Sequence, residues 1–246
     1  MTRYAEYLAG NYGTNADVTW MLDTQEIHLV LHTNPDGRKQ AETGLLWRKN
    51  TNPVNCGNNN NRGIDLNRNF PYNWACCGGS SGQGCAETYR GPTPGSEPET
   101  QAVRDYMQAI FPDYGDPGSG NPVPPDSAGL FIDIHSYGQL LLWPWGGTTT
   151  VAPNGIALQT LGRKFAYFNN HLPEQSIYLY ATDGTTIDNI YGQLGVSAFT
   201  FEIGNNFFQD CATFTNSILP TNMRPPTSVI CCRTSRAAFS TARPEM

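Results

Sequence analysis

The stretch FIDIHSYGQLLLWPWG, residues Phe131–Gly146, carries the clearest fold signal in the chain. Its first half alternates: Phe131, Asp133 and His135 fall on one face, and the isoleucines between them fall on the other. This period of two, with β-forming residue types, predicts a strand. A histidine that ends a strand and precedes polar and then aromatic residues is typical of a cleft. From this stretch alone, a functional histidine and a buried core histidine explain His135 equally well.

Strands alternate with helices along the rest of the chain. Mostly apolar strands are predicted at Glu26–Thr33 and Gly195–Ile203, and Gly63–Phe70 begins as a strand. Long helices are predicted at Ser96–Pro112, which opens with a capping box, and at Asn154–Asn170. Shorter elements are a helix end at Thr2–Gly13, a helix at Asp17–Asp23 and a turn at Asn34–Gly37. This order predicts an α/β fold with helices on both faces of a sheet.

The composition bounds the class of protein. The chain has 246 residues, enough for one domain with a sizeable core. Only 15% of the residues are charged, while 25 are Gly and 18 are Pro, which favours a loop-rich secreted domain. The net charge of −6 argues against a nucleic-acid partner. No apolar run approaches the roughly 20 residues of a membrane span, so no membrane partner is expected.

The cysteines point to disulfides. Seven are present, and they lack the CxxC spacing of a zinc finger. Cys76, Cys77 and Cys85 flank the sequence GGSSGQG, which reads as a surface loop stapled by disulfides. Disulfides predict a secreted protein, although the sequence does not open with a signal-peptide pattern. The odd count leaves at least one thiol unpaired or paired outside the chain.

Polar side chains gather at three predicted strand ends. These side chains are Asp65, Asn67 and Arg68, then His135, and then Glu202. In an open α/β sheet such ends share one rim, where a histidine, a carboxylate and an arginine can form a hydrolytic site. Each residue alone also has an ordinary explanation: Arg68 could form a surface ion pair, and Glu202 could cap a turn.

A series of short motifs carries a family resemblance. They are NPDG (Asn34–Gly37), WRKN (Trp47–Asn50), GIDLNRNF (Gly63–Phe70), ETYRG (Glu87–Gly91), SEPET (Ser96–Thr100), the Phe131–Gly146 stretch, TTID (Thr185–Asp188) and FTFEIG (Phe199–Gly204). In their order and spacing the chain resembles the M14 zinc carboxypeptidases of the carboxypeptidase A/B type, most closely the secreted bacterial members, over roughly Thr2–Pro220. The resemblance implies a mixed, mostly parallel twisted sheet. It also implies non-proline cis peptide bonds at Ser136–Tyr137 and Pro144–Trp145.

The resemblance implies a role for each matching residue. His135 matches the third zinc ligand, and Glu202 matches the general base that takes a proton from zinc-bound water. Zinc lowers the pKa of that water towards about 7. Asn67 and Arg68 match the pair that grips the terminal carboxylate of the substrate, which the planar fork of arginine binds at two points. Arg48 matches the arginine that polarises the scissile carbonyl.

Further positions complete the implied site. Asp65 matches a carboxylate that orients the first histidine ligand of the zinc. Tyr180 matches a mobile tyrosine that closes over the substrate, with Tyr178 as the alternative. Ile187 lies where relatives that prefer basic residues carry an acid. The resemblance therefore implies a preference for neutral apolar or aromatic C-terminal residues.

The metal site departs from the family pattern. The family's first two zinc ligands come from an HxxE motif, and this sequence contains none. On the predicted strand, His28 and His32 lie about 13 Å apart, too far for both to reach one zinc at about 2 Å. His171 reads as a helix-end residue. His135 is therefore expected to be the one protein ligand of an incomplete Zn2+ site.

The two ends of the chain also depart from the pattern. Met1 falls inside a predicted helix, so the N-terminal strands of the family are expected to be missing. A partial catalytic domain is expected over residues 1–223. Residues 224–246, rich in Arg, Pro and Cys, stand where the family has its final helix and are expected to form a poorly ordered tail. Together these departures predict a truncated or frame-shifted gene product.

Two functions compete on this reading. The first is a zinc carboxypeptidase that acts on the C-termini of peptides or proteins. The second is an inactive, metal-poor fragment or pseudoenzyme that binds peptide carboxylates through Asn67, Arg68 and Arg48. In either case we expect a secreted monomer, and stoichiometric zinc after dialysis would exclude the second function.

Overall fold

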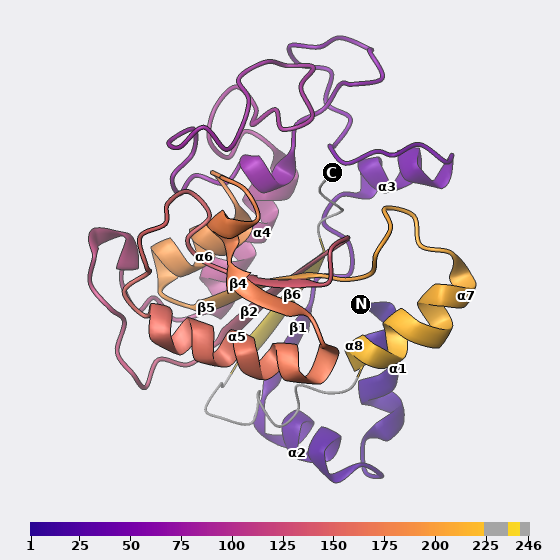
Figure 1. The fold of residues 1–246 in the computed structure, drawn as a ribbon, viewed down its shortest axis with the longest axis vertical. Coiled ribbons are helices and arrows are strands. Elements are labelled where there is room, and N and C mark those ends of the chain that lie inside the picture. Colours follow the sequence, from indigo (N-terminus) through magenta and orange to yellow (C-terminus); the bar gives the residue numbers. More distant parts are fainter. Residues whose placement is uncertain (224–235, 242–246) are drawn as a thin grey trace.

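A six-stranded sheet forms the centre of the structure (Figure 1). The structure, a computed structural model, describes residues 1–223 and 236–241. The strands are β1 Glu26–Leu29, β2 Leu130–His135, β3 Leu140–Trp143, β4 Leu172–Gln175, β5 Ser197–Glu202 and β6 Arg236–Thr241. They lie in the order β1-β6-β2-β5-β3-β4, and each neighbouring pair is parallel except β3 with β5. The predicted α/β fold with a mixed, mostly parallel sheet is therefore confirmed.

Helices and short helical turns connect the strands. The longer helices are α1 Thr2–Asn11, α2 Ala16–Thr24, α3 Pro35–Glu42, α4 Pro98–Ile110, α5 Gly155–Asn169 and α6 Thr186–Leu194. The short turns are η1 Leu66–Arg68, η2 Pro117–Ser119, η3 Ser176–Tyr178, α7 Cys211–Thr213, η4 Phe214–Ile218 and α8 Leu219–Met223. Within the two described ranges, no helix combines the length and the apolar character needed to span a bilayer.

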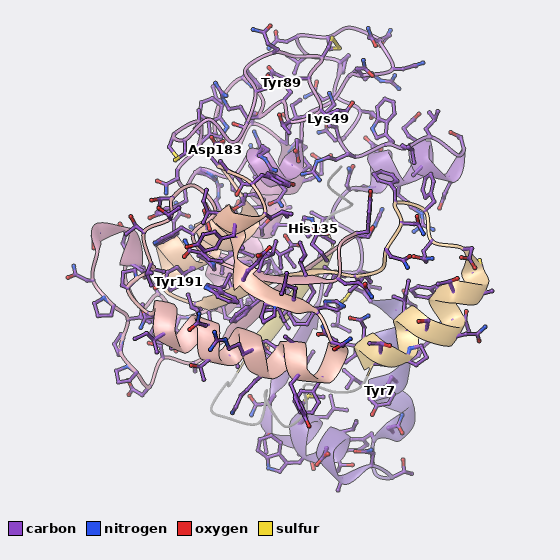
Figure 2. All side chains as sticks on the ribbon, viewed as in Figure 1. Tyr7, Lys49, Tyr89, His135, Asp183 and Tyr191 are labelled. Atoms are coloured by element: carbon purple, nitrogen blue, oxygen red, sulfur yellow. A yellow bond between two sulfur atoms is a disulfide. The ribbon has the colours of Figure 1, made fainter. Side chains whose placement is uncertain are left out.

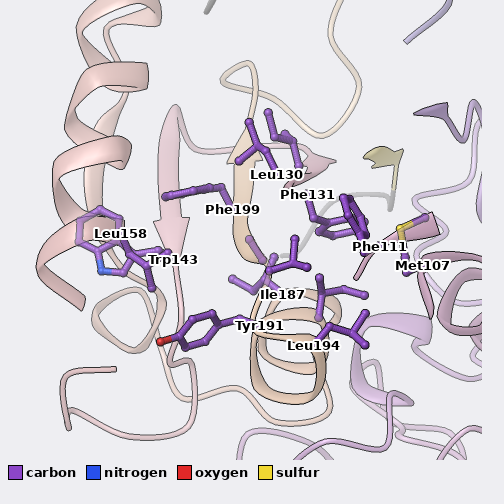
Figure 3. Packing of buried hydrophobic residues seen from close by; sticks show 14 of the residues in the cluster. Met107, Phe111, Leu130, Phe131, Trp143, Leu158, Ile187, Tyr191, Leu194 and Phe199 are labelled. Atoms are coloured by element: carbon purple, nitrogen blue, oxygen red, sulfur yellow. The ribbon is translucent and has the colours of Figure 1, made fainter. Parts of the chain in front are cut away.

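Helices cover both faces of the sheet, as predicted. α5 packs against β3 and β4, and α6 packs against β5 and β2. Phe165 of α5 meets Phe199 and Phe201 edge to face, so one face of β5 is turned toward α5. Phe131 of β2 is registered with Ala198, one residue before Phe199, and therefore projects from the opposite face. Figure 3 shows side chains of α6 packed beside Phe131. This buried core holds β2 and β5 side by side and positions their carboxyl ends.

The best predicted helix begins differently from its predicted form. Ser96 and Glu99 form no capping box, because Glu97 occupies the N-cap position of α4. The hydroxyl of Ser96 donates instead to the carboxylate of Glu97. Pro98 opens the helix, where the missing N–H of proline costs no hydrogen bond. The fixed backbone angle of Pro98, rather than a capping box, therefore favours the start of α4 at this residue.

Two other segments form helical turns instead of their predicted shapes. The turn predicted at Asn34–Gly37 is the start of α3, with Asn34 as a side-chain cap. Gly63–Phe70 forms no strand and ends in η1, where the Asp65 carboxylate accepts a hydrogen bond from the N–H of Asn67 at 3.0 Å. An Asn side chain that caps the first turn favours the start of a helix, which explains the first difference. An Asp side chain that bonds to a nearby N–H competes with strand pairing, which explains the second.

The Phe131–Gly146 stretch forms two strands, β2 and β3. The cis peptide bond Ser136–Tyr137 lies in the turn between them, and the cis bond Pro144–Trp145 follows β3. Both cis bonds occur where they were predicted. The strand predicted at Glu26–Thr33 is shorter in the structure and ends at Leu29.

The expected tail is described only in part. Arg236–Thr241 forms β6, which pairs in parallel with β1 on one side and with β2 on the other. For these residues the structure differs from the expected poorly ordered segment. Pairing on both sides satisfies backbone groups, so a segment without a clear strand pattern can still enter a sheet. The rest of that expectation concerns residues 224–235 and 242–246, which lie outside the described residues.

Disulfides staple the loop predicted to carry them. One joins Cys56 to Cys85, and another joins the adjacent residues Cys76 and Cys77. Cys211 is a free, exposed thiol. The remaining two cysteines of the sequence lie outside the described residues.

Acidification is expected to destabilise the fold through His171. Its imidazole is buried, with Nδ1 at 3.2 Å from the carbonyl oxygen of Leu140. Burial lowers the pKa of His171 to about 4, although the contact with Leu140 opposes part of this shift. Below about pH 6.5 the unfolded chain therefore binds a proton that the folded protein refuses until about pH 4. The free energy of unfolding of the protein therefore decreases as the pH falls through that window.

The test compares the wild type with His171→Asn by chemical denaturation near pH 7 and near pH 4. From pH 7 to pH 4 the free energy of unfolding of the wild type should fall by up to about 3 kcal/mol more than that of the variant. Other titrating groups are common to both proteins and cancel in the comparison. Equal losses in the two proteins would contradict the prediction.

Candidate active site

His135 and Glu202 meet where two parallel strands end. They are the last residues of β2 and β5, and the register pairs them directly. His135 Nδ1 lies 3.9 Å from Glu202 Oε1, and His135 Nε2 lies 3.0 Å from Asp133 Oδ2. All three side chains are almost completely buried. Figure 2 shows His135 near the middle of the molecule, below the loops that carry Lys49 and Asp183.

Asp133 is a member of this cluster that the sequence analysis did not assign. It lies on the same strand face as His135, two residues earlier, and this spacing was the available signal. The side chain has 1% exposure, and Oδ1 accepts no hydrogen bond from any described residue. A buried carboxylate oxygen of this kind is costly unless another group binds it.

Burial perturbs the acid chemistry of Glu202. Desolvation raises the pKa of its carboxyl to about 7, against the opposing effect of His135 and Arg48, while the nearby carboxylate of Asp133 raises it further. Glu202 Oε2 accepts no hydrogen bond within the described residues. A carboxyl group with a pKa near neutrality can both accept and release a proton at physiological pH.

The turn η1 brings Asn67 beside the histidine. Asn67 Nδ2 lies 3.5 Å from His135 Nε2, although the two residues are 68 positions apart. Asn67 Oδ1 accepts hydrogen bonds from the N–H and the hydroxyl of Thr186, at 2.9 and 3.0 Å. The side-chain amide of Asn67 therefore connects η1 to Thr186, the first residue of α6. Its oxygen contacts Thr186 and its nitrogen contacts His135.

Arg68 follows in the same turn and is one of the most deeply buried residues of the chain. Its Nη1 donates to the carbonyl oxygen of Asn67 at 2.7 Å, and its Nε donates to that of Gly79 at 3.1 Å. Its Cζ lies 6.0 Å from the ring centre of Tyr180. Two of its nitrogens thus donate to backbone oxygens, and these two bonds fix the orientation of the guanidinium plane.

Arg48 forms a buried ion pair with Asp65. Its Nε donates to Oδ2 at 2.9 Å, and its Nη2 donates to Oδ1 at 3.0 Å. Asp65 was predicted to orient a histidine ligand of zinc. In residues 1–223 and 236–241 its oxygens accept hydrogen bonds from Arg48 and from the N–H of Asn67 instead. The side chain thus joins the Arg48 loop to the turn that carries the carboxylate-binding candidates.

The structure separates the two tyrosine candidates. Tyr180 is half-buried and lies over Arg68, whereas Tyr178 is 66% exposed on η3. Ile187, predicted to set the C-terminal preference, is the second residue of α6 and is buried in the hydrophobic cluster (Figure 3). The family resemblance assigned Tyr180, with Tyr178 as the alternative, and the structure places Tyr180 beside Arg68. The contact of Tyr180 with a substrate stays a prediction.

The described residues do not form a complete metal centre. No group of three or more His, Cys, Asp or Glu side chains in the described part of the chain has a geometry that could hold a metal ion. Catalytic zinc is held by three protein ligands as a rule. His135, with Asp133 and Glu202 beside it, is therefore a partial site, and zinc does not fit these residues as a stably bound ion.

Comparison with known proteins agrees with this architecture. The model of the zinc carboxypeptidase family matches residues 1–228, so the chain belongs to this family. It is 33% identical to carboxypeptidase A1 of Rattus norvegicus over 236 residues, which are 89% of this chain and 50% of that protein. It is 39% identical to metallocarboxypeptidase A of Trichophyton tonsurans over 173 residues, 67% of this chain and 37% of that protein. The chain thus spans half, or less, of the length of these relatives.

Solved structures agree on the fold. Thrombin activatable fibrinolysis inhibitor superposes with a TM-score of 0.72 at 22% identity, covering 93% of this chain and 59% of that one. Carboxypeptidase A from Helicoverpa armigera superposes with a TM-score of 0.63 at 24% identity, covering 80% of this chain and 48% of that one. At these identities the superpositions support the fold alone.

Proposed function

We propose that the chain supplies the substrate-binding and proton-transfer part of a metallocarboxypeptidase, which removes the C-terminal residue of peptides. The observation that carries this proposal is the buried Arg68, held by backbone oxygens beside the His135–Glu202 pair. A positive fork next to a proton-accepting carboxyl suits a reaction at a bond close to a free carboxylate. Family membership supports the same activity.

Each residue has a proposed role that its own atoms can perform. Arg68 binds the terminal carboxylate of the peptide, and Asn67 donates its amide N–H groups toward the same anion. Arg48 donates to the oxygen of the scissile carbonyl as negative charge develops there. Glu202 accepts a proton from the water that attacks the carbonyl carbon, and it returns this proton to the leaving amine as the C–N bond breaks. Zinc would need ligands beyond the described residues, and none of these roles passes through it.

The proposal also covers the substrate preference, the secretion and the oligomeric state of the protein. Ile187 supports a preference for apolar or aromatic C-terminal residues, because an apolar side chain there offers no partner to a basic one. The two disulfides support export to an oxidising compartment. The substrate is a peptide or protein C-terminus, and the protein acts as a monomer.

A second candidate function is binding of peptide C-termini without catalysis. It is favoured by the lack of a three-ligand metal group among the described residues. In this case Arg68, Asn67 and Arg48 capture the carboxylate, and the peptide bond stays intact.

Two measurements on the purified chain separate the candidates. Metal content after dialysis and hydrolysis of a blocked dipeptide ending in Phe test the peptidase. Binding of the same peptide as a free acid and as an amide tests carboxylate capture. One metal ion per chain with hydrolysis supports the peptidase, and preference for the acid without metal or hydrolysis supports the binding module. Equal binding of acid and amide, with no hydrolysis, would reject both.

A further inference from the structure

One buried carboxylate, that of Asp183, holds the loop Cys77–Ser80. Asp183 Oδ2 accepts hydrogen bonds from the N–H groups of Cys77 and Gly79, at 3.3 and 3.0 Å. Its Oδ1 accepts a hydrogen bond from the hydroxyl of Ser80. The residue is 1% exposed, and Figure 2 shows it among the loops above the sheet. Three donors from one short loop converge on this side chain, so the loop conformation depends on it.

The same loop contacts the proposed carboxylate-binding arginine. The carbonyl oxygen of Gly79 accepts the hydrogen bond from Arg68 Nε at 3.1 Å, while Arg68 Nη1 donates to Asn67. Two bonds from two nitrogens of a rigid planar group define the orientation of its plane. Gly79 also approaches the Asp183 segment closely, since a Cβ on it would lie 2.3 Å from Cα of Thr182. The loop, Arg68 and Asp183 are therefore closely packed and joined by hydrogen bonds.

We propose that Asp183 is a positioning residue: through the Cys77–Ser80 loop it sets the orientation of Arg68 and hence the affinity for a C-terminal carboxylate. Gly79 intervenes between the two side chains, so the effect reaches the ligand only through the arginine. The inference rests on the proposed function of Arg68. It adds to the site a residue in the segment between η3 and α6. This segment is remote in sequence from the Cys77–Ser80 loop that Asp183 holds.

The sign of the effect distinguishes positioning from simple electrostatics. Asp183 is a negative charge near a site for an anion. By Coulomb's law, removing that charge alone would strengthen carboxylate binding. Positioning predicts the opposite, because a guanidinium that loses its alignment binds the carboxylate less well. A displacement of about 1 Å at a reacting or binding group can cost on the order of 100-fold.

The test is the variant Asp183→Asn, in which the side chain keeps its size but one acceptor oxygen becomes a donor. The readout is the ratio of affinities for a peptide ending in Phe as a free acid and as an amide. We expect this ratio to fall about tenfold. The matched control is Glu97→Gln. Glu97 is equally buried, and its carboxylate accepts from Asn50, Asn52 and Ser96. Among the described residues this carboxylate makes no hydrogen bond with Cys77–Ser80. Only the backbone N–H of Glu97 reaches Asn69, next to Arg68, and the substitution leaves that bond in place, so the ratio should stay at the wild-type value.

A double variant and an NMR measurement complete the design. In an Arg68→Met background, Asp183→Asn should leave the acid-to-amide ratio unchanged, since coupled residues are non-additive. Independently of any ligand, the Arg68 Nε–H should exchange with solvent faster in Asp183→Asn than in the wild type. A ratio that is unchanged or increased in Asp183→Asn, or unchanged exchange, would overturn the inference. Lack of acid preference in the wild type would instead reject the proposed function, and the exchange rate would still decide whether Asp183 orders Arg68.

Discussion

Asp65→Asn is expected to lower the free energy of unfolding by about 3–5 kcal/mol. Asp65 and Arg48 share two hydrogen bonds, at 2.9 and 3.0 Å, and their side chains are only 2% and 7% exposed. Removing the carboxylate charge deprives a buried guanidinium of this counter-charge, which costs much more than the same change at a surface. Asparagine keeps an oxygen that can accept from the N–H of Asn67, so the cap of η1 survives. Urea denaturation of both proteins measures the difference.

Two controls test the cause of this loss. Glu6→Gln breaks the ion pair of Glu6 with Arg3, whose side chains are 54% and 66% exposed, and should cost at most about 1 kcal/mol. Adding Arg48→Met to Asp65→Asn should recover much of the stability, because the double variant no longer buries a guanidinium that has lost the Asp65 carboxylate. A cost for Asp65→Asn no larger than that for Glu6→Gln would contradict the prediction.

Arg68→Met is expected to weaken binding of a free-acid peptide by about 100-fold or more. The variant removes the positive charge and the planar fork that would face the carboxylate, while it keeps much of the apolar stem. Arg68→Lys keeps the charge without the fork and should lose about tenfold. Calorimetric titration with a peptide ending in Phe measures both losses, and the amide of that peptide serves as the reference ligand.

Each variant must be shown to fold, because Arg68 is almost fully buried and its substitution can disturb the packing. Near-ultraviolet circular dichroism and the melting temperature report whether each variant keeps its packing. Arg104→Met on α4 is the matched control: Arg104 pairs with Asp105 on an exposed face and should leave peptide affinity unaltered. Equal affinities of the wild type and a folded Arg68→Met for the free acid would remove Arg68 from the site.

The strands and long helices could be predicted because their patterns are local. The alternation in Phe131–His135 and the apolar faces of α4 and α5 follow from the periods of strand and helix, which need no partner to be recognised. Predictions were wrong where side chains bond to nearby backbone. At Asn34 and Asp65 a side chain accepts from an N–H within three residues, and this competes with the strand or turn that the residue types suggest.

The order of residues alone was enough to predict the α/β class, the family resemblance and the identity of the candidate residues. It also showed that the HxxE motif is absent. The specific contacts came from the folded structure: Glu202 lies beside His135, Arg48 pairs with Asp65, and Tyr180 lies over Arg68. Local periodicity specifies each element, whereas contacts between distant residues depend on strand register and helix packing. Asp133 had a signal in the sequence, its place two residues before His135 on one strand face, whereas only the tertiary contacts connect the buried carboxyl of Asp183 to Arg68.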